Sequence, residues 1–134
     1  HAPERAMHAL ERAGIADLAE RRGASLGLLA RKRLELARAL AADPLVLLLD
    51  EVAGGLTEAE TAELSKVLDE IRRTGVALVW VEHGVTQLAG FVDRLLALDR
   101  GRVVAVGRPD EVLTDPEVVR TYLGDEIART EAGA

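Results

Sequence analysis

The stretch Leu45–Glu51, LVLLLDE, decides the fold class of this 134-residue chain. Five consecutive apolar residues predict a β-strand that is buried on both faces, as strands are in a parallel sheet covered by helices. Such a strand presents Asp50 and Glu51 at the carboxyl edge of the sheet, where open α/β sheets bind their ligands. An acid pair at this edge can hold a metal ion and polarise a water molecule, which makes phosphate chemistry the first hypothesis.

A second apolar segment, VALVWV at residues 76–81, predicts a second strand, and it is followed directly by Glu82 and His83. Between the two strands lie a loop with adjacent glycines, residues 52–57, and a helical segment that reaches Arg73. Two strands joined by one helix are expected to be parallel. The acid pair and His83 are therefore predicted to lie at the same edge of the sheet.

Helices are predicted before these strands, and a β-hairpin with short helices after them. Thr57 is a predicted N-cap, because Glu60 three residues later completes a capping box. The hairpin is predicted to have a three-residue loop at residues 99–101. The remaining predicted elements are helices at residues 3–13, 15–22, 28–42, 84–91, 110–113 and 116–123, strands at 95–98 and 103–106, and a frayed polar tail from residue 124.

Composition excludes several classes of function. The net charge is −6 and the chain has one Phe, one Trp and one Tyr, so neither a basic face nor base stacking favours nucleic-acid binding. The chain has no cysteine, which excludes disulfides and thiolate metal sites. No apolar run approaches the ~20 residues of a membrane-spanning helix.

In order and spacing, these segments resemble the ATP-binding subunit of an ABC transporter. The helix at residues 31–40 follows the position of the signature motif, the strand ending at Asp50 corresponds to Walker B, residues 52–57 to the D-loop, and His83 to the H-loop histidine. The resemblance continues through residues 91–99, 101–107 and 111–113. The final Tyr122-Leu123-Gly124 is most like the ATPases of branched-chain amino-acid importers.

The family's phosphate-binding loop, G-x-x-x-x-G-K-[ST], does not occur in the sequence. The resemblance therefore implies the C-terminal half of a nucleotide-binding domain: a partial P-loop NTPase α/β layer without the Walker A strand. We expect one partial domain over residues 1–134, with a helical signature segment at 1–43, the catalytic-core half at 44–124 and the tail at 125–134. Sheet edges left unpaired by the missing strand predict that the isolated chain is oligomeric, domain-swapped or rearranged.

The resemblance assigns catalytic roles to three residues. Asp50 would hold Mg²⁺ through a water molecule, Glu51 would orient and deprotonate the attacking water, and His83 would contact the γ-phosphate of ATP. Mg²⁺ and ATP are expected only in the complete domain. The structural alternative is that the acid pair caps a loop and that His83 is an ordinary surface or core residue.

Two further segments correspond to nucleotide-binding motifs. Gly54, Gly55 and Thr57 match the loop that crosses to the partner subunit, although two glycines can equally form a plain turn. The signature motif falls on residues 26–30, where the expected Leu-Ser-Gly-Gly-Gln reads Leu-Gly-Leu-Leu-Ala, with Ser25 one place early. Of the motif's phosphate-binding groups, only Ser25, Gly27 and the helix N-terminus could still contact phosphate. The basic residues of the next helix, Arg31, Lys32, Arg33 and Arg38, are interpreted as a solvated face.

The resemblance implies an ATPase that works beneath a membrane permease as a dimer of nucleotide-binding subunits, on the inner face of the cell membrane. It would drive uptake of branched-chain or related amino acids, and the chain alone is expected to be inactive. Two alternatives stay open. One is a non-catalytic module that docks on a permease or regulator, and the other is a fragment of a DNA-repair ATPase, which the acidic charge and the importer-like ending disfavour.

Overall fold

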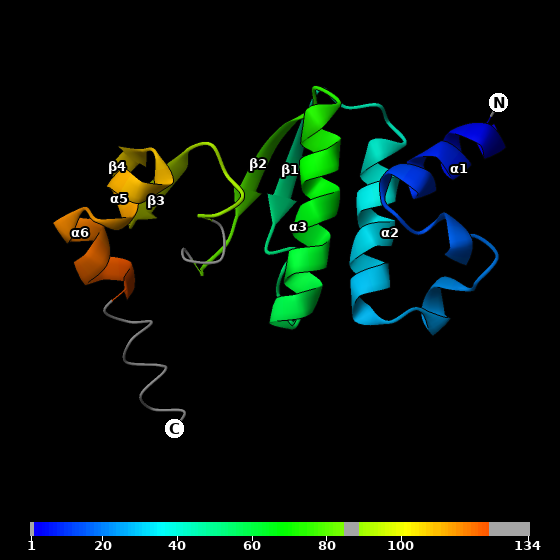
Figure 1. Ribbon diagram of the computed structural model, residues 1–134, viewed down its shortest axis with the longest axis horizontal. Helices are drawn as coiled ribbons and strands as arrows, with labels where there is room; N and C mark the ends of the chain where they lie inside the picture. Colours follow the sequence, from blue (N-terminus) through cyan, green and yellow to red (C-terminus); the bar gives the residue numbers. More distant parts are fainter. Residues whose placement is uncertain (1, 85–88, 124–134) are drawn as a thin grey trace. The chain divides into compact units, whose positions relative to one another are not determined.

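The computed structural model describes residues 2–84 and 89–123 (Figure 1). The chain forms two compact units, His1–Glu82 and His83–Ala134. Each unit has its own two-stranded sheet and its own cluster of buried apolar residues. The assignment of the whole chain to one partial domain stays a prediction.

The first unit contains the helices and parallel strands expected from the sequence. Its elements are α1 (Ala2–Arg12), two 3₁₀ turns η1 (Ala16–Leu18) and η2 (Gly23–Ser25), α2 (Leu28–Leu40), β1 (Val46–Asp50), α3 (Glu58–Arg73) and β2 (Ala77–Val81). The predicted helix at residues 15–22 is wrong. A segment this short makes too few hydrogen bonds to offset helix nucleation, and buried Ile15 anchors it as a tight turn.

Strands β1 and β2 pair in parallel, with Val46 opposite Ala77 and Asp50 opposite Val81. Helices α2 and α3 pack on one face of this sheet (Figure 1), and Leu47 and Leu49 point into that core. The parallel arrangement predicted from the sequence is therefore confirmed.

The opposite face of the β1–β2 sheet is apolar and exposed. Residues Leu45, Val46, Leu48, Val79 and Val81 are 86%, 51%, 75%, 50% and 56% exposed. The prediction that β1 is buried on both faces is thus wrong for the described residues of this unit. The physical reason is that its helices cover only the face occupied by Leu47 and Leu49.

Helix α3 begins and ends as its sequence predicts. The Thr57 hydroxyl accepts a hydrogen bond from the Glu60 amide, and the Glu60 carboxylate accepts one from the Thr57 amide, which confirms the capping box. Gly75 follows the helix with φ +95°, a conformation that favours glycine.

The second unit contains the hairpin β3 (Leu95–Asp99) and β4 (Arg102–Gly107), followed by α5 (Pro109–Leu113), α6 (Pro116–Val118) and the π-helical turn η3 (Val119–Leu123). Asp99 pairs with Arg102, so the hairpin loop has two residues and the predicted three-residue loop is wrong. Arg100 and Gly101 have φ of 47° and 77°, as a type I′ turn requires. Residues 85–88 of the predicted helix at 84–91 lie outside the described residues, and residues 89–91 form a turn.

Candidate functional site

Asp50 and Glu51 lie where the sequence places them, at the carboxyl end of β1. Asp50 is the last residue of the strand, and both side chains are exposed. The backbone of Glu51 has φ 49°, in the left-handed region that non-glycine residues seldom adopt. Strain of this kind persists only where neighbouring contacts hold it, and it is concentrated at functional sites.

Three hydrogen bonds hold the Glu51 backbone. Its amide donates to the Val81 carbonyl at 2.9 Å, which extends the pairing with β2. Its carbonyl accepts from the Gly54 amide at 3.1 Å and from Lys32 Nζ at 3.3 Å. The acid that follows the strand is therefore fixed by β2, by its own loop and by α2.

Two basic residues of α2 do not fit the predicted solvated face. Lys32 is half-buried and reaches the Glu51 carbonyl. The Arg33 side chain is only 16% exposed and donates to the Gly14 carbonyl and to Glu63, each at 3.4 Å. Their interpretation as a solvated face is wrong, because both side chains tie α2 to neighbouring segments.

The two glycines of the loop after Glu51 are required by its compact shape. A Cβ on Gly54 would lie 3.2 Å from the Glu51 carbonyl oxygen, and one on Gly55, where φ is +78°, would lie 3.1 Å from Leu28 Cδ2. These contacts support the reading of a tight turn that brings the loop close to α2. A role of Gly54 and Gly55 in binding a nucleotide stays a prediction.

The other predicted binding residues are Thr57, Ser25 and Gly27. The side chains of Thr57 and Ser25 make hydrogen bonds to nearby residues. The hydroxyl of Thr57 is part of the capping box of α3. Ser25 Oγ donates to the Arg22 carbonyl at 2.7 Å, and Gly27 is the N-cap of α2 without a side-chain cap. Ser25 and Gly27 are exposed beside the N-terminus of α2, and their contact with phosphate stays a prediction.

Glu82 is a site residue that sequence reasoning missed. Its Oε1 accepts a hydrogen bond from the Ala53 amide and another from the Trp80 indole Nε1, both at 2.9 Å. Strand alternation indicates the contact between Trp80 and Glu82, because residues two apart in an extended chain project to the same side. His83 follows directly, is exposed and is the first residue of the second unit. Its place beside the acid pair stays a prediction.

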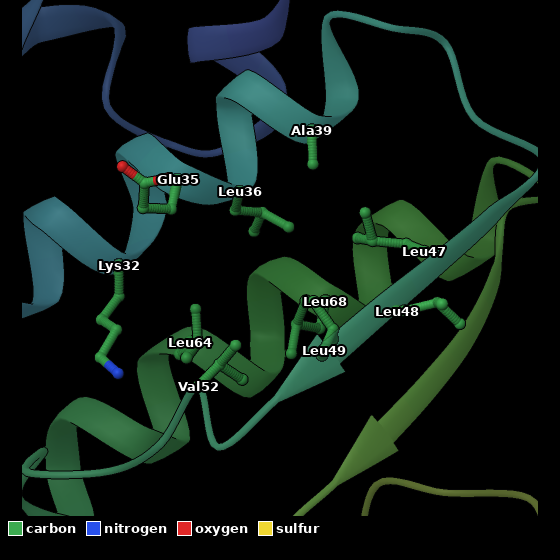
Figure 2. Close-up of a pocket in the computed structure, with 10 residues that line it drawn as sticks. All are labelled: Lys32, Glu35, Leu36, Ala39, Leu47, Leu48, Leu49, Val52, Leu64 and Leu68. Carbon is green, nitrogen blue, oxygen red and sulfur yellow. The ribbon is translucent and has the colours of Figure 1, made fainter.

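A cavity of about 140 Å³ lies in the first unit between α2, β1 and α3 (Figure 2). Lys32 and Glu35 are its charged lining residues. The others are apolar: Leu36, Ala39, Leu47, Leu48, Leu49, Val52, Leu64 and Leu68. In Figure 2 the Lys32 side chain extends from α2 past this cavity toward the segment that contains Val52, in keeping with its bond to Glu51.

The donor chemistry of the acid pair suits Mg²⁺, which prefers carboxylate oxygens and retains water ligands. The acid pair does not complete a metal site, because residues 2–84 and 89–123 contain no group of three or more His, Asp or Glu side chains that could hold a metal ion. The phosphate-binding loop is also absent from the sequence. Mg²⁺ binding by Asp50 stays a prediction. None of the helices in the described ranges is long and apolar enough to cross a membrane.

Sequence comparison places this chain beside ABC transporter ATP-binding proteins. Residues 102–128 match the family model of the branched-chain amino acid ATP-binding cassette transporter. The chain is 36% identical to the high-affinity branched-chain amino acid transport ATP-binding protein LivG of Salmonella typhimurium, over 91% of this chain and 48% of LivG. It is also 31% identical to the lipopolysaccharide export system ATP-binding protein LptB of Haemophilus influenzae, over 92% of this chain and 52% of LptB.

Solved structures give the same result. The ADP conformation of an ATP-binding cassette of an ABC transporter matches with a TM-score of 0.85 and 27% identity, over 92% of this chain and 50% of that one. A component of the cbiONQ ABC transporter complex from Clostridium perfringens matches with a TM-score of 0.80 and 31% identity, over 88% and 47%. The chain spans about half the length of the relatives it matches. The predicted resemblance to the C-terminal half of an ABC transporter ATP-binding subunit, and the partial P-loop NTPase fold, are confirmed.

Proposed function

We propose that this chain, similar to about half of an ABC transporter ATP-binding subunit, supplies the water-activating half of an ATP-hydrolysing site. The observation that carries the proposal is the acid pair at the end of β1, where the backbone of Glu51 is left-handed, donates a hydrogen bond to Val81 and accepts hydrogen bonds from Gly54 and Lys32. Such a strained, pre-positioned carboxylate suits a group that must orient a water molecule.

Each residue of the proposed site has one role. Asp50, exposed at the strand end, is a carboxylate ligand for the water shell of Mg²⁺. Glu51 orients the attacking water and accepts its proton. His83 contacts the γ-phosphate, as its correspondence to the H-loop histidine suggests. ATP and the remaining magnesium ligands require the phosphate-binding half of the domain, so the isolated chain does not turn over ATP.

We further propose that the transported solute is a branched-chain or related amino acid. The match of residues 102–128 to the branched-chain family model and the 36% identity to LivG support this assignment. The similarity to LptB shows that the shared core also occurs in an export system, so it is the C-terminal segment that favours amino-acid uptake. The proposed partners are a second nucleotide-binding subunit and membrane permease subunits, which would place the protein on the inner face of the membrane.

A second candidate function is a non-catalytic module that docks on a permease or regulator. It is supported by the altered signature motif and by the local bond of Ser25 to the Arg22 carbonyl. In this case Glu51 would be an element of the loop structure and not a base.

The test is Glu51→Gln in the full-length protein that carries this chain, with Glu70→Gln as the matched control because Glu70 is an exposed glutamate on α3. Removal of a general base lowers turnover by about 10²–10⁴-fold. We expect a loss of this size for Glu51→Gln and unchanged hydrolysis for Glu70→Gln. Equal hydrolysis by both variants would exclude the catalytic function and favour the docking module.

The exposed face of the β1–β2 sheet also supports the proposal that the chain alone self-associates. Apolar patches of several hundred Å² on a soluble protein mark surfaces that another element covers. Val46, Leu48, Val79 and Val81 expose half or more of their apolar side chains on this face. Light scattering that shows a monomer across the micromolar range would contradict this proposal.

A further inference from the structure

Glu82 connects two segments that are 29 residues apart in the sequence. Its Oε1 accepts from the Ala53 amide, in the loop after the acid pair, and from the Trp80 indole, on β2. Both distances are 2.9 Å, within the range of well-formed hydrogen bonds to a carboxylate.

The Ala53 amide depends on this carboxylate. Ala53 is only 7% exposed. If its amide lost the Glu82 acceptor, water could not readily replace the hydrogen bond, and an unpaired buried amide is costly. Glu82 and Trp80 are half-buried, which strengthens a charge-assisted bond relative to one in open solvent. The position of Ala53 is therefore set by a side chain of the other strand.

Ala53 lies two residues after Glu51, inside the turn closed by the bond from the Gly54 amide to the Glu51 carbonyl. Lys32 and Glu82 thus bind two different residues of this turn, Glu51 and Ala53. Because Glu51 is in a strained conformation, the turn must be fixed from outside for the carboxylate to keep one orientation.

We propose that Glu82 is a positioning residue that sets the orientation of Glu51 through Ala53. Glu82 precedes His83 directly, so it connects the proposed phosphate-contacting residue to the loop that carries the proposed base. The catalytic effect of Glu82 rests on the proposed function, whereas its contacts with Ala53 and Trp80, the relay, can be measured on the chain alone.

The chain offers a direct spectroscopic test, since Trp80 is its only tryptophan and gives one indole N–H resonance. Nuclear magnetic resonance would follow this resonance and the hydrogen exchange of the Ala53 amide. We expect Glu82→Ala to shift the indole resonance upfield and to speed Ala53 exchange at least about tenfold, as loss of a charge-assisted bond implies. Glu82→Gln keeps a carbonyl acceptor but loses the charge, so it should speed Ala53 exchange moderately and shift the indole resonance less than Glu82→Ala does. Glu70→Ala is the matched control.

Unchanged indole shift and Ala53 exchange in Glu82→Ala would overturn the relay. If Glu82→Ala unfolds the chain, Glu82→Gln decides the question: a moderate acceleration of exchange that is localised at Ala53 supports the relay, and exchange equal to that of the unsubstituted chain contradicts it.

The catalytic consequence is tested in the full-length protein. We expect Glu82→Ala to lower kcat at least about tenfold with little change in KM for ATP, and Glu82→Gln to restore most of kcat, because a misaligned base slows chemistry more than binding. If Glu51→Gln abolishes turnover while Glu82→Ala leaves kcat unchanged, the positioning role is wrong and the proposed function stands. If Glu51→Gln does not affect turnover, the proposed function is wrong, and the resonance measurements still decide the relay.

Discussion

Replacement of Glu51 by glycine should stabilise the chain relative to replacement by alanine. Both substitutions remove the carboxylate and every contact of the side chain beyond Cβ. They differ only in whether a Cβ remains at a backbone position with φ 49°. The comparison therefore isolates the strain of the left-handed conformation from the loss of the charged group.

The magnitude follows from two opposing terms. A Cβ in the left-handed region raises the energy of the folded state by about 1–2 kcal/mol. Glycine at the same position lowers the free energy of unfolding by about 0.4–1 kcal/mol, because it gives the unfolded chain more conformations. With the middle of each range, the difference favours Glu51→Gly over Glu51→Ala by about 0.8 kcal/mol.

Urea unfolding followed by the fluorescence of Trp80 measures this difference in the first unit, which contains the only tryptophan. With a denaturant dependence of about 2 kcal/mol per molar urea, the midpoint of Glu51→Gly should lie about 0.3–0.5 M above that of Glu51→Ala. The same pair of substitutions at Glu70, inside α3, should give the opposite order by about 1 kcal/mol. If alanine at position 51 is as stable as glycine, Glu51 is not strained and the reasoning about its positioning is wrong.

Three further predictions concern the described elements. Thr57→Ala should lower the free energy of unfolding by about 1 kcal/mol through loss of the capping box with Glu60, with Thr57→Ser close to the unsubstituted chain in the same urea assay. The hydrogen bond from Arg72 lowers the pKa of Asp69 below its usual value of 3.8. The stability that ionised Asp69 contributes is therefore present above pH 3.8 and is lost as the pH falls through the lowered pKa. Asp69→Asn should remove this loss when the free energy of unfolding is measured against pH. Leu48→Asp, on the exposed sheet face where Leu48 is 75% exposed, should shift the isolated chain toward monomer in light scattering, and unchanged association would place the contact elsewhere.

The sequence predicted the parallel strands and the main helices because strong local signals agreed with the final packing. The apolar run before Asp50 became β1, and Thr57 with Glu60 formed the cap of α3. How many faces of β1 are buried does not follow from the sequence, since an apolar run alone does not show whether helices cover both faces. The exposed Leu48 shows that here they cover one.

The site was predicted from the sequence only in part. The placement of Asp50 and Glu51 at a strand end follows from the apolar run. The left-handed backbone of Glu51 depends on hydrogen bonds with Val81, Gly54 and Lys32, and Val81 and Lys32 are distant from it in the sequence. Helical spacing alone places Lys32 on a solvated face, because it does not indicate contact with another loop. The sequence does not single out Glu82, because its bond to Ala53 links residues that only the fold brings together.

The most direct test of the central claim measures ATP hydrolysis by this chain, by a separately produced polypeptide that carries the phosphate-binding half of the same protein, and by the two mixed. We predict no hydrolysis above background by either half, hydrolysis by the mixture, and a loss of at least about 100-fold when the mixture contains Glu51→Gln. Hydrolysis by this chain alone, or a Glu51→Gln mixture as active as the unsubstituted one, would contradict the account.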